Sequence, residues 1–64
     1  MAIRQKGDTI QIETSKTEAG VRALCREVAA ARNNYNLDKL EISFGQNNEG
    51  ESTIIAKMPR QERQ

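Results

Sequence analysis

The sequence lacks histidine and tryptophan, and its 64 residues include one cysteine, one proline, one tyrosine and one phenylalanine. Without histidine, a zinc site of the usual Cys/His type is excluded, and Cys25 has no imidazole to activate its thiol. A single cysteine cannot form a disulfide framework, and an unpaired thiol is typical of a reducing compartment. We therefore expect no metal, no cofactor, no enzymatic activity and a cytoplasmic location.

Neither sign of charge dominates, because ten basic and nine acidic side chains give a formal net charge of +1. Such a chain has no overall field that would steer it to nucleic acid or to an anionic membrane, although a local basic patch is compatible with this balance. No apolar run approaches the roughly 20 residues that span a bilayer. The start, Met1 to Arg4, lacks the apolar region of a signal peptide. We expect no membrane partner.

The short chain bounds both the number of domains and the stability. A chain of this length forms one domain and buries only about 60% of its unfolded surface. We expect one α+β domain over residues 1–59 and a frayed polar tail over residues 60–64. Because no disulfide or zinc site supplies the missing stability, we expect self-association as a dimer or higher closed oligomer.

One segment, from Ser15 to about Tyr35, has the periodicity of a long amphipathic helix. Ser15 and Glu18 have the spacing of a capping box, which predicts where the helix begins. Its apolar stripe consists of Val21, Leu24, Val28, Ala31 and Tyr35. Cys25 lies at the edge of this stripe, and we predict that it is a buried, inert thiol. Gly20, near the helix start, suggests either a close approach to a sheet or simple tolerance of glycine.

Two strands are predicted before the helix. Residues 2–6 and 9–13 flank Gly7 and Asp8, and glycine at the first central position favours a type II′ hairpin. A two-residue loop places Ile3 opposite Ile12, so that the apolar side chains of both strands share one face. The register therefore agrees with the hydrophobic pattern.

Two more strands are predicted after the helix, over residues 39–45 and 51–58. Pro59 ends the second of them because proline cannot donate to a ladder. The order strand–strand–helix–strand–strand predicts an α+β two-layer sandwich, with a four-stranded antiparallel sheet and one helix packed across one face. The predicted core is Ile3, Ile10, Ile12, Val21, Leu24, Val28, Tyr35, Leu40, Ile42, Phe44, Ile54 and Met58.

Two surfaces are candidates for function. The outer sheet face carries Arg4, Lys6 and Lys57, which together with the Arg60/Arg63 tail could contact phosphates. The same face lacks the aromatic side chains on which bases usually stack, and an ordinary solvated sheet face is the alternative.

The second surface is the side of the helix that faces away from the sheet. It presents four candidate partner-binding residues, Arg22, Arg26, Ala30 and Asn33. Alanine lets another backbone approach closely, and two arginines one turn apart can bind a carboxylate or a phosphate. Plain helix surface is the alternative, since helix propensity alone accounts for alanine.

The order of elements from Thr9 to Lys57 resembles the layout of dodecins, and the same order opens ribosome-hibernation factors. A dodecin-like reading implies a flavin-binding shell, but this chain has no tryptophan to stack on the flavin. Neither resemblance carries a binding residue over to this sequence.

From these features we expect a small non-enzymatic binding protein that self-associates and occupies a surface of a larger protein, as a regulator or inhibitor does. Its size would also suit a phage- or plasmid-borne gene. A nucleic-acid-binding module that uses the outer sheet face is the alternative. A small-ligand carrier in an oligomeric shell is a third class.

Overall fold

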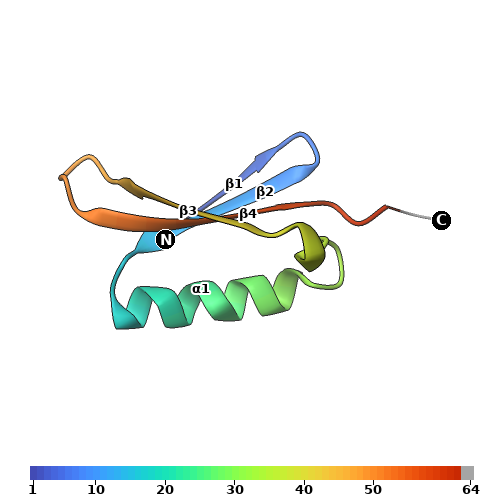
Figure 1. Cartoon of the computed structure of the whole chain (residues 1–64), viewed down its shortest axis with the longest axis horizontal. Coiled ribbons are helices and arrows are strands. Elements are labelled where there is room, and N and C mark those ends of the chain that lie inside the picture. The colour runs from blue at the N-terminus through green and yellow to red at the C-terminus, as the bar shows by residue number, and fades with distance from the viewer. Residues whose placement is uncertain (63–64) are drawn as a thin grey trace.

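The computed structural model, which describes residues 1–62, confirms the predicted α+β fold. Its elements in chain order are β1 (Ala2–Lys6), β2 (Thr9–Ser15), α1 (Glu18–Ala31), a short 3-10 helix η1 (Leu37–Lys39), β3 (Glu41–Gln46) and β4 (Ser52–Pro59). The strands form one antiparallel sheet in the order β1-β2-β4-β3. Helix α1 lies against one face of this sheet (Figure 1).

The first hairpin has the predicted loop and the predicted register. Gly7 has a φ of 56°, as the first central residue of a type II′ turn requires. Lys6 pairs with Thr9 across the loop, and Ile3 pairs with Ile12. The two-residue loop therefore sets this register, and the pattern of apolar and polar residues agrees with it.

The second hairpin closes through Asn47 and Gly50. The side-chain oxygen of Asn47 accepts hydrogen bonds from the backbone N–H groups of Glu49, at 2.9 Å, and Glu51, at 3.0 Å. Gly50 has a φ of 79°, which glycine adopts without strain. Strand β3 begins later than predicted because residues 37–39 form η1, which Asn36 caps by accepting from the N–H of Asp38 at 3.0 Å.

Helix α1 begins at Glu18 and not at Ser15, so the predicted capping box is wrong. Ser15 is the last residue of β2 and is paired with Thr53. Thr17 is the N-cap, and its hydroxyl oxygen accepts from the N–H of Gly20 at 3.0 Å. A Cβ at Gly20 would collide with the carbonyl oxygen of Ser15, which confirms a close approach of helix and sheet.

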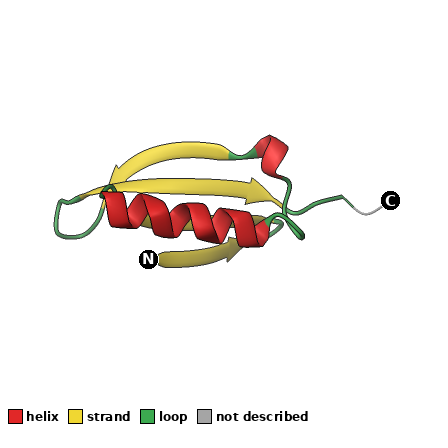
Figure 2. Cartoon of the chain, turned by 90° about the horizontal axis from the view of Figure 1, so that it is seen from below, coloured by secondary structure: helices red, strands yellow, loops and turns green. Residues whose placement is uncertain are grey.

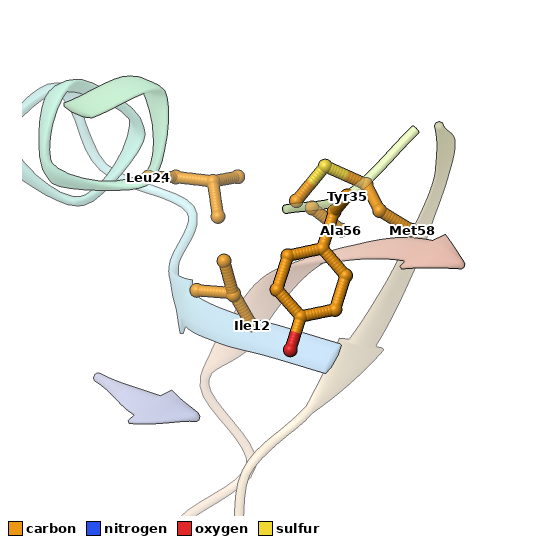
Figure 3. Packing of buried hydrophobic residues seen from close by; sticks show 5 residues of the cluster. All are labelled: Ile12, Leu24, Tyr35, Ala56 and Met58. Carbon is orange, nitrogen blue, oxygen red and sulfur yellow. The ribbon is translucent and has the colours of Figure 1, made fainter. Parts of the chain in front are cut away.

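The buried core is smaller than predicted. It consists of Ile12, Leu24, Tyr35, Ala56 and Met58, which meet between α1 and the middle of the sheet (Figure 3). The side chains of Ile10, Val28, Ala31, Leu37, Leu40 and Ile54 are partly buried around it.

Four predicted core residues are exposed instead: Ile3, Val21, Ile42 and Phe44. For the three that lie on edge strands, Ile3, Ile42 and Phe44, the reason is the width of the helix. A helix with its side chains is about 10–12 Å wide, and strands are about 4.8 Å apart, so one helix covers roughly two strands. Helix α1 packs on β2 and β4 and leaves both edge strands uncovered, as Figure 2 shows for β3.

The chain remains attached to the domain beyond Pro59. The N–H of Arg60 donates to the carbonyl oxygen of Asp8 at 2.6 Å, and the N–H of Gln61 donates to that of Asn34 at 2.9 Å. Residues 60 and 61 of the expected polar tail are therefore hydrogen-bonded to the rest of the domain. Residues 63–64, which include Arg63, lie outside the described part of the chain. No helix within residues 1–62 has both the length and the apolar character needed to cross a membrane.

Candidate interaction surfaces

An open apolar groove of about 330 Å³ lies between α1 and strand β3. Its helical wall includes Val21, Cys25 and Val28, and its other wall and floor include Leu40, Ile42 and Ile54. Every side chain that lines it is apolar or a thiol. The groove exists because β3 carries inward-facing apolar side chains that α1 does not reach.

Phe44 extends this apolar surface along β3. It points to the same face as Ile42 because the two residues are two positions apart on one strand. Its side chain is 63% exposed. The ammonium group of Lys16 lies 4.8 Å from the centre of the ring, which is a cation–π contact. The one phenylalanine of the chain therefore remains mostly in solvent.

Cys25 is exposed, so the predicted buried thiol is wrong. Its position at the edge of the helical stripe was correct, since it lines the groove. The groove is open because α1 covers β2 and β4 only, and the thiol therefore meets solvent and not packed side chains.

The outer side of α1 is exposed, as predicted. Arg22, Arg26, Ala30 and Asn33 all lie on the protein surface. Arg22 is engaged with Glu18, one helical turn earlier, through a 3.0 Å ion pair. Exposed pairs of this kind contribute only about 0.3–0.5 kcal/mol, so Arg22 can exchange Glu18 for another partner at little cost.

The outer sheet face brings together three of the four predicted nucleic-acid residues. Arg4 and Lys57 both pair with Gln11, so they flank the same residue of β2, and Lys6 lies two positions farther along β1. Two acids interrupt this group. Glu41 lies directly opposite Lys57 on β3.

Glu13 is the second acid on this face, and it is held in place. Its carboxylate accepts a hydrogen bond of 2.7 Å from the hydroxyl of the buried Thr53. Glu13 also lines, with Arg4, an open polar hollow of about 600 Å³. The outer face is thus of mixed charge and not a basic patch.

Arg60 does not join this group. Its guanidinium carbon lies 5.6 Å from the centre of the Tyr35 ring. Tyr35 belongs to the core on the other side of the sheet. The structure therefore separates Arg60 from Arg4, Lys6 and Lys57.

The groove is the feature that sequence reasoning missed. The alternation of residues in β3 correctly placed Ile42 and Phe44 on the inner face of the sheet. Alternation shows which face a side chain points to, but it does not show whether the helix covers that strand. The number of predicted elements could have indicated the groove, because one helix cannot cover four strands.

In residues 1–62, no three His, Cys, Asp or Glu side chains are grouped so that they could hold a metal ion. Comparison of the chain with protein-family models, with curated proteins and with solved structures gave no match.

Proposed function

We propose that this chain is a small non-enzymatic binding protein that associates with itself and acts by occupying a surface of a larger protein. The observation that carries the proposal is the uncovered apolar surface formed by the groove together with Phe44. Contiguous apolar surface of this kind marks interaction sites in small proteins, since exposing it to water is unfavourable.

The two exposed surfaces suit different partners. The groove is lined by apolar side chains and one thiol. A second copy bound there would cover the exposed side of the thin core, so this surface suits self-association. The outer face of α1 combines alanine with the charged side chains of Arg22 and Arg26, which suits a polar surface on a larger protein. Arg26 and Ala30 each lie about 160° around the helix from Val28 in the groove wall, so both contacts can form at once.

A cytoplasmic location is part of the proposal. Cys25 is a free thiol that is open to solvent. An exposed unpaired thiol persists in a reducing compartment and is oxidised outside it.

The rival function, nucleic-acid binding by the outer sheet face, has less support. Glu13 and Glu41 lie among Arg4, Lys6 and Lys57, and the carboxylates would repel phosphate groups. Phe44 and Tyr35 are the only aromatic residues of the chain, and neither lies on that face.

Affinity capture with matched baits tests the larger-partner part of the proposal. The wild-type chain is expected to retain a host protein in fixed stoichiometry, and Ala30→Glu is expected to lose it, because a charge replaces a small contact residue. Lys6→Glu, on the outer sheet face, is the control and should retain the same protein.

Two results would contradict this part of the proposal. One is a retained protein that Ala30→Glu does not affect. The other is retained nucleic acid that Lys6→Glu abolishes and that dissociates steeply as salt rises, which is the signature of counterion release.

A further inference from the structure

Strands β1 and β3 form the two edges of the sheet, and they differ in how well they are protected against pairing. Edge strands present unpaired backbone groups, and proteins usually block such edges with charges, prolines or bulges. Strand β1 has five residues and carries Arg4 and Lys6. If two copies paired along their full β1 strands, Arg4 would face Arg4 of the other copy, and the like charges would oppose pairing.

Strand β3 carries no such protection. Its sequence is Glu-Ile-Ser-Phe-Gly-Gln, with one charge and no proline or lysine. Its register with β4 is continuous over all six residue pairs, so no bulge interrupts it. Residues 41–44 are all exposed, and within residues 1–62 the second edge of β3 has no strand beside it (Figure 2).

We propose that β3 is the dimerisation edge of this protein, and that its occupant is the β3 strand of a second copy, paired antiparallel about a two-fold axis at Ser43. This inference rests on the self-association in the proposed function and names the surface that performs it. The product is an eight-stranded sheet in which both helices lie on the same face, since the two-fold axis is perpendicular to the sheet.

The register follows from the side-chain pattern. Residues that lie directly opposite each other in an antiparallel pair point to the same face of the sheet. The apolar side chains of the two β3 strands therefore share a face only if the numbers of the paired residues add to an even number. A centre at Ser43 pairs Ile42 with Phe44 of the second copy, and this pair occurs twice. A centre at Phe44 would place Ile42 opposite the polar Gln46, and a centre at Ile42 would pair only three strand residues.

Electrostatics also permit the Ser43 register. The one charged residue of β3, Glu41, faces Gly45 of the second copy, so no like charges meet. The same register places Phe44 of the second copy beside Ile42, at the open side of the groove. The exposed aromatic ring of each copy thus covers apolar surface of the other.

The exposed area comes close to what a weak, specific dimer buries. Val21, Ile42 and Phe44 are 39%, 47% and 63% exposed. Since a phenylalanine buries about 150–250 Å², these three side chains present roughly 300 Å² per copy. Two such surfaces and two strand edges approach the ~1,200 Å² at the low end of specific interfaces, and we expect a roughly micromolar dissociation constant.

A charge swap at Ser43 tests the proposal. Ser43→Lys and Ser43→Glu each place like charges opposite one another on the two-fold axis, and each is expected to weaken the dimer by about tenfold or more. An equimolar mixture of the two variants should restore the dimer as a heterodimer. Sedimentation equilibrium measures the masses. Ile55→Lys, on the same face of the neighbouring strand β4, is the control and should dimerise as the wild type does.

A cross-link provides a second readout that does not depend on charge. In a Cys25→Ser background, Ser43→Cys should form an intermolecular disulfide under mild oxidation, because opposed strand residues have Cβ atoms about 4.5–5.5 Å apart. Gln46→Cys in the same background should not form one, since the two positions lie at opposite ends of the paired strands.

The possible failures are distinguishable. If Ser43→Lys remains as dimeric as the wild type, or if only Ala30→Glu splits the dimer, the β3 assignment is wrong and self-association stands. Masses that grow beyond the dimer would indicate head-to-tail pairing of β1 with β3 and would also overturn it. A wild-type chain that stays monomeric at high micromolar concentration contradicts both the β3 edge and the self-association.

Discussion

Replacing Leu24 by alanine is expected to lower the free energy of unfolding by about 2–5 kcal/mol. Leu24 is 4% exposed and is the only helical side chain among the five that form the buried core. A chain of this size has a total stability of roughly 3–10 kcal/mol. The loss is therefore a large share of the total, and we expect the variant to be largely unfolded at physiological temperature.

Phe44→Ala is the matched control for Leu24→Ala. The sequence pattern assigns both side chains to the core, and the structure buries only Leu24. At a fixed, low protein concentration, Phe44→Ala should cost no more than about 1 kcal/mol, chiefly through the lost contact with Lys16. Urea denaturation followed by circular dichroism measures both variants. If Phe44→Ala lowered the free energy of unfolding as much as Leu24→Ala does, helix α1 would have to cover β3.

Ala56→Leu is expected to destabilise the fold by about 1–3 kcal/mol or more, through overpacking. Ala56 is fully buried and lies between Ile12 on β2 and Ile42 on β3. At this central position a larger side chain has to push α1 away from the sheet. The melting temperature of the variant, measured at the wild-type concentration, reports the effect.

The control for Ala56→Leu is Ala30→Leu, which adds the same atoms on the exposed side of α1. Leucine and alanine are both good helix formers, so the expected change is within about 0.5 kcal/mol. If Ala56→Leu were as mild as Ala30→Leu, the layer between the helix and β4 would have to be loosely packed.

Local patterns predicted the strands and their register. The Gly7-Asp8 loop fixed the pairing of Ile3 with Ile12, and the positive φ of Gly50 followed from its place in a polar turn. These features depend on a few neighbouring residues, and so they can be derived from sequence. The start of α1 was misplaced because both Ser15 and Thr17 can cap a helix, and the longer β2 strand decided between them.

Burial was predicted less well because it depends on how elements lie over one another. Ala56 was not predicted as core, since alanine gives little hydrophobic signal, yet it is fully buried beneath the helix. Phe44 is strongly hydrophobic and was predicted as core, yet it is exposed. The same cause explains the candidate site: the groove and the unprotected β3 edge depend on which strands α1 covers.

Self-association is tested by sedimentation equilibrium of the wild-type chain across the low to high micromolar range. We expect a mass that rises from the 7.2 kDa of one chain to twice that value and then stays constant. The melting temperature should rise over the same range, because association stabilises only the folded state. A constant mass of one chain, with a melting temperature independent of concentration, would show that the protein does not self-associate.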